Sequence, residues 1–255
     1  MTEAAERGAT SGIQVIARAA EMLRVIQASP GGLSQADIAH RLGLARSTVH
    51  RILSALEDEG FVSVQASRGR YRLGPEMTRM AEAGRRELVA RIRPLLVNLS
   101  RDLNETVDLS ILDGNHITFI DQVVAPRALR AVSAVGESFP LHCTAPGKAI
   151  LAALPADEIG PRLVGRLHPM TPNTITTMSA LRKELKQVAR NQGLGIDREE
   201  HHEGISALGV AIVDVASSPI AISVPVPSQR FAGRETEIAQ GLLSVRDQIR
   251  VALTD

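Results

Sequence analysis

Aromatic side chains and cysteine are scarce in this chain of 255 residues, which has no Trp, one Tyr and one Cys. A core made from this composition has to be aliphatic, and a stacking platform for single-stranded nucleic acid is not expected. The lone thiol, Cys143, has no partner for a disulfide and offers too few ligands for a cysteine-based zinc finger. The composition therefore argues against an aromatic platform for single-stranded nucleic acid, an internal disulfide and a cysteine-based zinc finger.

Long apolar runs are missing as well. No stretch of about 18 apolar residues occurs, so a membrane span is not expected. Residues 1–11 lack the basic-then-apolar order of a signal peptide, which makes the cytoplasm the expected location. With 44% hydrophobic and 22% charged residues, the composition is that of a soluble globular protein. Its length allows one large domain or two modest ones.

An overall excess of one charge is also absent, because the net charge is only +1. This argues against a protein coated in basic surface. Between residues 41 and 72, however, six arginines stand against three acidic residues. A local basic face on a nearly neutral protein favours a sequence-reading contact with DNA over non-specific coating.

The first third of the chain predicts a compact helical unit. Residues 1–12 are rich in Ala, Glu, Gly and Thr and are predicted to be disordered. Apolar periodicity and turn residues predict, in order, helices over 13–28, 34–42 and 45–59 and strands over 61–64 and 70–73. Gly43 lies between the second and third helices. A helix that ends in the left-handed backbone conformation favours glycine at this position, because glycine has no Cβ. This order predicts a winged helix-turn-helix over residues 13–74.

The third of these helices divides into an apolar and a polar face. Its inward stripe is Val49, Ile52, Leu53 and Leu56. The polar residues left on the opposite or leading surface are Arg46, Ser47, Thr48, His50 and Arg51. A recognition helix needs this division, because its donors enter the major groove while its other face packs. Arginine can bind guanine O6 and N7, and Ser or Thr can bind a phosphate or a base edge.

The wing adds Arg68 and Arg70, which could reach adjacent phosphates or the minor groove. The alternative for the whole segment is a solvated helix with ordinary surface arginines. The preceding helix, the glycine turn and the wing favour the DNA-binding interpretation.

The rest of the chain predicts a linker helix over 75–90 and then a domain of mixed α/β character over 91–255. The Asp113-Gly114 pair is a hairpin signal between two of the expected strands. Strands are expected over 106–112, 117–124, 129–135, 205–213 and 220–226, and helices over 92–103, 147–154, 178–191 and 235–253. Strands in hairpins with flanking helices predict an antiparallel-leaning sheet, and thus an α+β protein of two domains.

Several segments together resemble one family. The matching segments are Leu33–Ala39, Leu42–Leu53, Leu56–Phe61, Tyr71–Gly74, Leu141–Ala152, Gly193–Glu200 and Gly204–Ala207. In this order they resemble the IclR family of bacterial regulators, and the resemblance runs from about Ile13 to the C-terminus. It implies a winged-helix domain, a linker helix and a GAF-like ligand domain. It also implies homodimers or dimers of dimers on palindromic operators, with small organic or aromatic acids as effectors.

Two positions depart from the family pattern. Ala207 stands where many members carry Cys, and Pro225-Val226-Pro227 replaces a more usual Ser-Gly-Pro ending after Ser223. The resemblance implies that both positions face the ligand pocket. Ala207 therefore predicts a slightly roomier and less polar wall.

The expected effector site gathers around the start of the helix at residue 147. Backbone N–H groups of Ala145, Gly147 and Lys148, after Thr144 and Pro146, would favour a carboxylate. Asp197 and Ser223 could bind a hydroxyl or amine, and Ile205, Ala207 and Ala131 could form apolar walls. For each of these residues the alternative role is capping or core packing. Gly147-Lys148 is not a phosphate-binding Walker A loop, because His142 and Ala149 occupy required motif positions.

Two other functions remain open at this point. His201 and His202 could make the protein a metal-responsive regulator by binding a metal ion with the acidic residues around 197–203, either alone or together with His142 and Cys143. A solvated loop is the favoured interpretation of this segment. Cys143 beside His142 could be a nucleophile with its base, but adjacent side chains of an extended segment point apart. No enzyme activity and no cofactor are expected.

Overall fold

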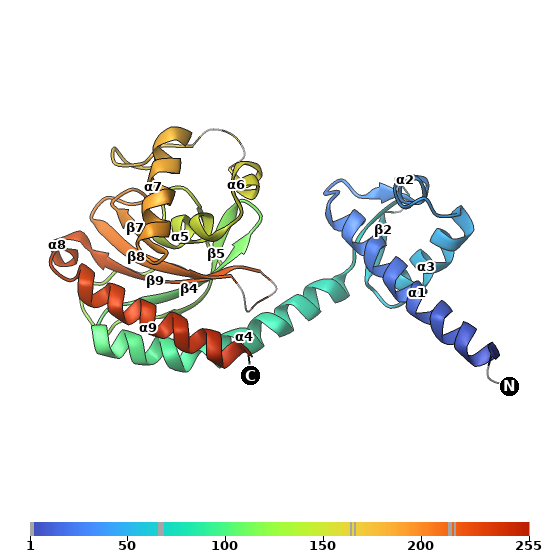
Figure 1. Ribbon diagram of the computed structural model, residues 1–255, viewed down its shortest axis with the longest axis horizontal. Helices are drawn as coiled ribbons and strands as arrows, with labels where there is room; N and C mark the ends of the chain where they lie inside the picture. Colours follow the sequence, from blue (N-terminus) through green and yellow to red (C-terminus); the bar gives the residue numbers. More distant parts are fainter. Residues whose placement is uncertain are drawn as a thin grey trace. The chain divides into compact units, whose positions relative to one another are not determined.

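The computed structural model describes residues 3–65, 69–163, 165, 167–213, 216 and 218–254, with side chains from residue 14 onward. The chain divides into two compact units, Met1–Arg86 and Glu87–Asp255. The division falls within one helix, α4 (Pro75–Leu103) (Figure 1). Each unit is described by itself.

The N-terminal unit consists of helices around a small antiparallel sheet. Its elements are α1 (Glu3–Gln27), β1 (Leu33–Ser34), α2 (Gln35–Leu42), α3 (Arg46–Asp58), β2 (Val62–Gln65) and β3 (Arg70–Leu73). The sheet order is β1-β3-β2. Buried aliphatic residues join all three helices to the wing, among them Met22, Ile38, Val49, Leu53 and Val62. The predicted winged helix-turn-helix is confirmed, with a short additional strand.

Local signals fix both ends of α2. The backbone N–H of Asp37 donates to Ser34 Oγ at 3.1 Å, and the Ser34 N–H donates to Asp37 Oδ2 at 3.1 Å, which forms a capping box. The Ser34 hydroxyl also donates to Asp37 Oδ2 at 2.8 Å, and this bond, together with that from the Ser34 N–H, lowers the pKa of Asp37. Gly43 has φ 63°, and its N–H donates to the carbonyls of Ala39 and His40. The turn before α3 therefore has the left-handed end expected from the sequence.

The beginning of α1 differs from the sequence prediction. Residues 1–12 were expected to be disordered, but the helix already begins at Glu3. Segment 3–7 contains Glu, Ala and Arg, which favour helix, and it continues into the amphipathic stretch that packs on the unit.

The C-terminal unit is built on one six-stranded sheet. Its strands are β4 (Val107–Asp113), β5 (His116–Val123), β6 (Ser138–Pro140), β7 (Leu194–Arg198), β8 (Ile205–Ile212) and β9 (Ile220–Pro227). They lie in the order β6-β5-β4-β9-β8-β7, and each neighbouring pair is antiparallel. The central strands β4 and β9 come from distant parts of the sequence, so the sheet closes only when both ends of the unit are present.

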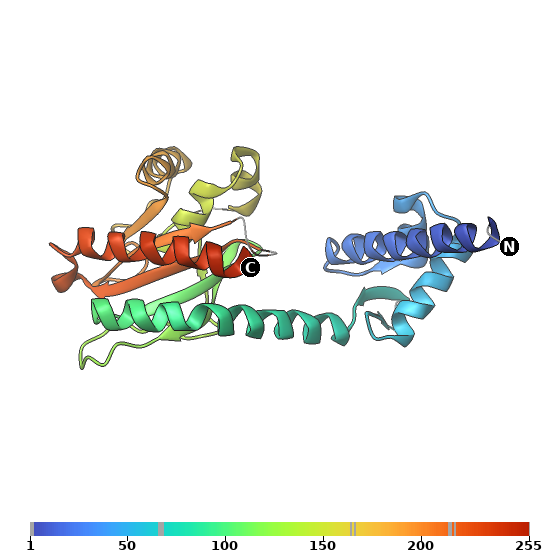
Figure 2. The ribbon, with the colours of Figure 1, turned by 60° about the horizontal axis from the view of Figure 1, so that its bottom comes forward.

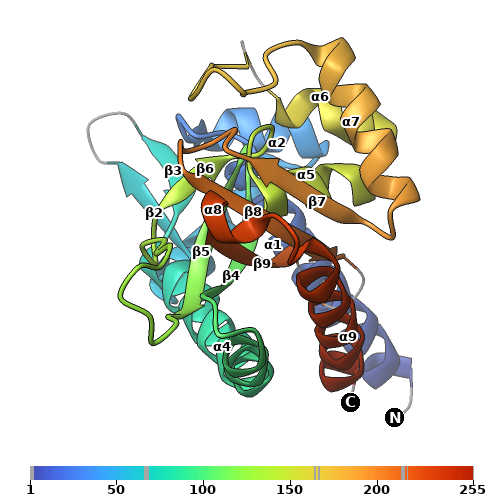
Figure 3. The ribbon, with the colours of Figure 1, turned by 90° about the vertical axis from the view of Figure 1, so that its left-hand side faces the viewer.

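Helices cover both faces of this sheet (Figures 1 and 2). They are α4, α5 (Ala145–Ala153), α6 (Ala156–Arg162), α7 (Met178–Arg190), α8 (Ser228–Phe231) and α9 (Glu235–Thr254). One core joins α4 and α9 to residues such as Leu109, Leu208 and Ile222, and a second joins α5 and α7 to residues such as Phe119 and Ala221. Figure 3 shows the two layers from another side.

Two predicted elements differ in the structure. The helices expected over 75–90 and 92–103 are one helix, because Pro94 removes only a single N–H donor from α4. The strand expected over 129–135 is wrong: the third strand of this region is β6. The large apolar residues Leu129, Val132 and Val135 are 62%, 57% and 59% exposed, so they do not mark the buried face of a strand. Pairing with β5 starts only at Gly136, whose N–H donates to the Phe119 carbonyl.

Candidate functional site

The polar face of α3 is exposed and its apolar stripe is buried. Val49, Ile52 and Leu53 are buried, and Leu56 is half-buried against the same core. The polar residues Arg46, Ser47, His50 and Arg51 are exposed, with Thr48 half-buried. The Gln35 side chain donates to the Arg46 carbonyl at 3.0 Å, which ties the start of α3 to α2. The helix is thus fixed on one side and open on the other.

The guanidinium groups of the α3 arginines make no contact that holds them within the described part of the protein. Among the described residues, neither Arg46 nor Arg51 has an ion-pair or hydrogen-bond partner for its guanidinium group. Arg70 differs, because its Nη1 donates to the Gly32 carbonyl at 2.9 Å and so holds the wing to the loop before β1. Arg68 lies outside the described residues. Both α3 arginines therefore keep their guanidinium donors free on the exposed face of the helix.

In the C-terminal unit, the start of α5 lies directly on the sheet. A Cβ at Gly195 would be 2.2 Å from the Ala145 carbonyl oxygen, and one at Gly209 would be 2.8 Å from the Pro146 nitrogen. Thr144 precedes the helix, but its hydroxyl donates to the Pro140 carbonyl at 2.9 Å and does not cap the helix. The Lys148 N–H donates to the Thr144 carbonyl, so the sequence expectation that it is free for a ligand is wrong.

Strand register brings most of the expected effector residues to the sheet face that α5 covers. Asp197 pairs with Ala207 across β7 and β8, and Ser223 pairs with Gly209 across β8 and β9. Ile205 lies two residues from Ala207 on the same strand and is half-buried. Sequence segments from three strands and one helix therefore meet at one place.

A polar cluster that the sequence analysis did not single out adjoins this place. Asp108 pairs with Ser223 across β4 and β9 and is buried. Its Oδ1 accepts from Gln122 Nε2 at 2.6 Å, and its Oδ2 accepts from Ser133 Oγ at 2.9 Å. Burial raises the pKa of Asp108 to about 7, while these two hydrogen bonds act in the opposite direction. Ser133 belongs to the loop that carries the buried Ala131, so the cluster ties this loop to the sheet.

Lys148 forms a second buried cluster. Its side chain is 0% exposed, and its Nζ lies 2.5 Å from Glu200 Oε1 and 3.2 Å from Glu184 Oε1. Asp197 Oδ1 accepts from the Glu200 N–H at 2.7 Å, and burial raises the pKa of Asp197 to about 7. The Lys148 charge is neutralised by protein carboxylates, so it does not supply a positive charge for an acidic effector.

The histidines near residue 200 are engaged in packing and local contacts. The His201 ring lies against Phe139 with centroids 4.3 Å apart, and His202 Nδ1 lies 2.7 Å from the Glu203 carbonyl oxygen. Within the described part of the chain, no group of three or more His, Cys, Asp or Glu side chains is arranged to hold a metal ion. Burial raises the pKa of Cys143 to about 12, which makes it a poor nucleophile.

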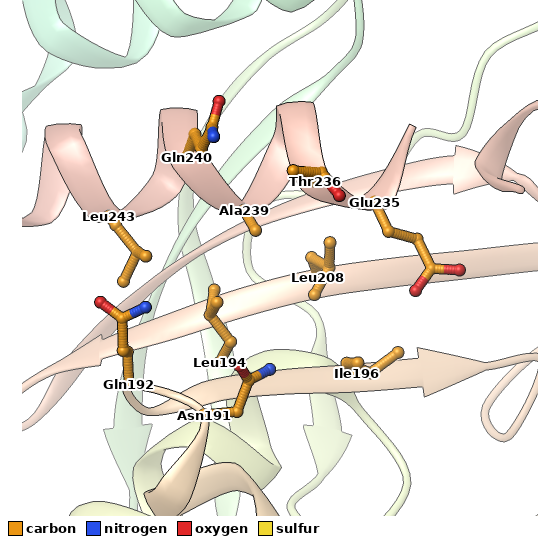
Figure 4. A pocket seen from close by; sticks show the side chains of 10 residues that line it. All are labelled: Asn191, Gln192, Leu194, Ile196, Leu208, Glu235, Thr236, Ala239, Gln240 and Leu243. Atoms are coloured by element: carbon orange, nitrogen blue, oxygen red, sulfur yellow. The ribbon is translucent and has the colours of Figure 1, made fainter. Parts of the chain in front are cut away.

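A separate hollow lies on the opposite sheet face, between α9 and strands β7 and β8 (Figure 4). It has a volume of about 340 Å³, with Leu194, Ile196 and Leu208 on the strand side and Ala239 and Leu243 on the helix side. None of the expected effector residues lines it.

The described part of the chain contains no helix with the length and hydropathy needed to span a membrane.

Two protein-family models match the chain. The IclR helix-turn-helix domain matches residues 15–66, and the C-terminal domain of the bacterial transcriptional regulator IclR matches residues 80–251. Together they cover both units of the structure.

Individual proteins show the same likeness. The HTH-type transcriptional regulator Rv1719 of Mycobacterium tuberculosis is 60% identical over 235 residues, which cover 92% of this chain and 90% of that protein. The solved structure of Thermotoga maritima IclR has a TM-score of 0.63 at 29% identity and covers 94% of this chain and 99% of that one. An IclR homolog from Microbacterium hydrocarbonoxydans, complexed with 4-hydroxybenzoate, has a TM-score of 0.61 at 22% identity, with 94% and 99% covered.

Proposed function

This chain belongs to the IclR family of bacterial transcriptional regulators, and from that premise we propose that it controls a catabolic operon by binding a palindromic operator. The observation that carries the proposal is the polar face of α3, which is exposed while the opposite stripe is buried. Arg46, Ser47, Thr48, His50 and Arg51 would contact the major groove. Arg68 and Arg70 would reach the flanking backbone or the minor groove.

A palindrome has two equivalent half-sites, so a homodimer or a dimer of dimers is the natural form of the regulator. It would act in the cytoplasm, where the operator is. We also propose that it performs no catalysis, since Cys143 is buried with a raised pKa.

The effector we propose is a small organic or aromatic acid in the C-terminal unit. Its carboxylate would lie at the start of α5, near Thr144, Ala145, Pro146 and Gly147. Asp197, Ser223 and the adjoining Asp108 would bind a hydroxyl group, and Ala131, Ile205 and Ala207 would form the walls. A homolog has been solved in complex with 4-hydroxybenzoate. This ligand carries both a carboxylate and a hydroxyl group, which supports an effector of the same kind for this chain.

DNA binding is tested with a mobility-shift assay on the protein's own upstream DNA. Loss of a bidentate base contact costs about 1–3 kcal/mol, so Arg46→Ala with Arg51→Ala should weaken binding about 30-fold or more. Lys183→Ala with Arg190→Ala is the matched control, because it removes two exposed cations from α7. Unchanged binding by the α3 double variant would refute the proposed role of this helix.

Effector binding is tested by a thermal-shift screen of organic acids that includes 4-hydroxybenzoate. A ligand at 100 times its Kd stabilises the folded state by about 2.7 kcal/mol. Ser223→Ala should reduce the stabilisation by removing a hydroxyl from the site, whereas Ser179→Ala, at an exposed position of α7, should not. Equal stabilisation of both variants would place the ligand elsewhere.

A further inference from the structure

An apolar groove on the outer side of α5, α6 and α7 is not used by the proposed regulator function. It has a volume of about 420 Å³, within the usual range for small-molecule sites. Its apolar lining is Ala152, Leu154, Ala156, Ile159, Leu185 and Ala189. Ala152, Leu154 and Ile159 are only half-buried, so apolar surface stays open to solvent here.

Two cations stand at this groove. Arg182 and Lys186 are both exposed and both line it, and their i, i+4 spacing places them on one side of α7. Neither has an ion-pair or hydrogen-bond partner among the described residues. Among the described residues that line the groove, none is acidic.

The nearby carboxylates are engaged or lie outside the groove. Glu184, the single acidic residue of α7, points to the buried Lys148 Nζ at 3.2 Å. On α6, Glu158 accepts from Arg162 at 2.9 Å, and neither it nor Asp157 belongs to the lining. Within the described part of the chain the two cations therefore have no negative partner, and the surface beside them is apolar.

We propose that this groove binds an amphiphilic carboxylate, with its aliphatic chain on the apolar lining and its head group between Arg182 and Lys186. The charge complementarity fixes the sign of the head group, and the six apolar residues fix the character of the tail. Arginine also pairs with a carboxylate in a bidentate manner. This site shares no residue with the effector site proposed on the inner face of α5, and it does not depend on that site.

Titration calorimetry of the full-length protein with decanoate tests the proposal. Arg182→Gln with Lys186→Gln should weaken decanoate binding about tenfold or more. Lys183→Gln with Arg190→Gln removes the same charge from exposed positions of the same helix outside the lining and should change the affinity less than twofold. Ala189→Trp, at an exposed lining position, should block the groove while keeping both cations.

The length of the tail gives an independent measurement. Burial of one methylene group strengthens binding about three- to fourfold, so affinity should rise along hexanoate, octanoate and decanoate. Equal weakening by the two double variants, or no gain with chain length, would overturn the proposal. Decanoate binding that persists in Ala189→Trp would also overturn it. The effector-site variant Ser223→Ala should leave this binding intact.

Discussion

The Asp108 carboxylate is held by two neutral side chains instead of a cation. Its partners, Gln122 and Ser133, lie 14 and 25 residues further along the chain. Asp121 adds a like charge nearby, although Asp121 itself pairs with Arg93. Burial, and to a smaller extent this like charge, raise the pKa of Asp108 and so stabilise its protonated form, although the two hydrogen bonds favour the charged form.

This arrangement predicts a pH-dependent stability. The pKa of Asp108 is about 7 in the folded state and near 3.8 when unfolded, so the folded state binds more protons between these values. The free energy of unfolding should therefore fall as pH rises from about 4 to about 7. Asp108→Asn should remove its share, up to about 4 kcal/mol at about 1.4 kcal/mol per pKa unit.

Urea unfolding of wild type and variant at several pH values measures this difference. Asp113→Asn, at an exposed position of β4, is the control and should leave the profile unchanged. Asp197 shifts in the same direction as Asp108 and titrates in both proteins, so only the wild-type minus variant difference reports on Asp108. A difference that is constant across this pH range would contradict the prediction.

Lys148 carries a second prediction at the residue scale. Lys148→Met removes the ammonium group from a fully buried site and leaves Glu200, only 7% exposed, without its counter-ion. Removing one partner of a buried ion pair costs about 3–5 kcal/mol. Lys183→Met, at an exposed position, should change stability by about 0.5 kcal/mol or less. Chemical denaturation compares the two, and similar values would show that the buried pair contributes little.

At the scale of elements, the sequence predicts the ends of helices well, because these depend on residues close together in the chain. It predicts less well which distant segments pair with one another. The ends of α2 follow from Ser34, Asp37 and Gly43, which act within a few residues, and the sequence predicted them. The strand expected over 129–135 is wrong because its large apolar residues are exposed and form no buried face. The residues of the effector site were singled out by family resemblance, whereas Asp108 was read only as part of a strand. Its partners are set by the fold of a loop, which periodicity does not describe.

The contact between α5 and the sheet gives a prediction for two strands. A Cβ at Gly195 or Gly209 would lie 2.2 Å or 2.8 Å from backbone atoms of α5, which cannot move without shifting the helix. Gly195→Ala and Gly209→Ala should each destabilise the protein by about 1–3 kcal/mol or more.

Gly84→Ala is the matched control, because nothing lies within 4 Å of its new Cβ. In the interior of α4 it should stabilise by about 0.5–1 kcal/mol. Unfolding curves of the three variants measure the contrast, and a harmless Gly195→Ala would show that α5 is not tightly seated.

For the whole molecule, a net charge of only +1 means that DNA binding has to come from local charge. Operator affinity should still depend steeply on salt, since each neutralised phosphate releases counter-ions. With six or more phosphate contacts, a rise from about 50 to 200 mM NaCl should weaken binding about 1,000-fold or more. Fluorescence anisotropy at increasing NaCl concentration measures the slope. A nearly flat salt dependence would argue that few phosphates are contacted.

The position of Cys143 has a practical consequence. The thiol is 0% exposed, and burial raises its pKa to about 12, so the folded protein offers a reagent neither access nor thiolate. A chromogenic disulfide such as Ellman's reagent would label only those molecules whose C-terminal unit has transiently opened. The rate of Cys143 labelling therefore reports how often the C-terminal unit opens, and the measurement needs neither an added label nor a mutation.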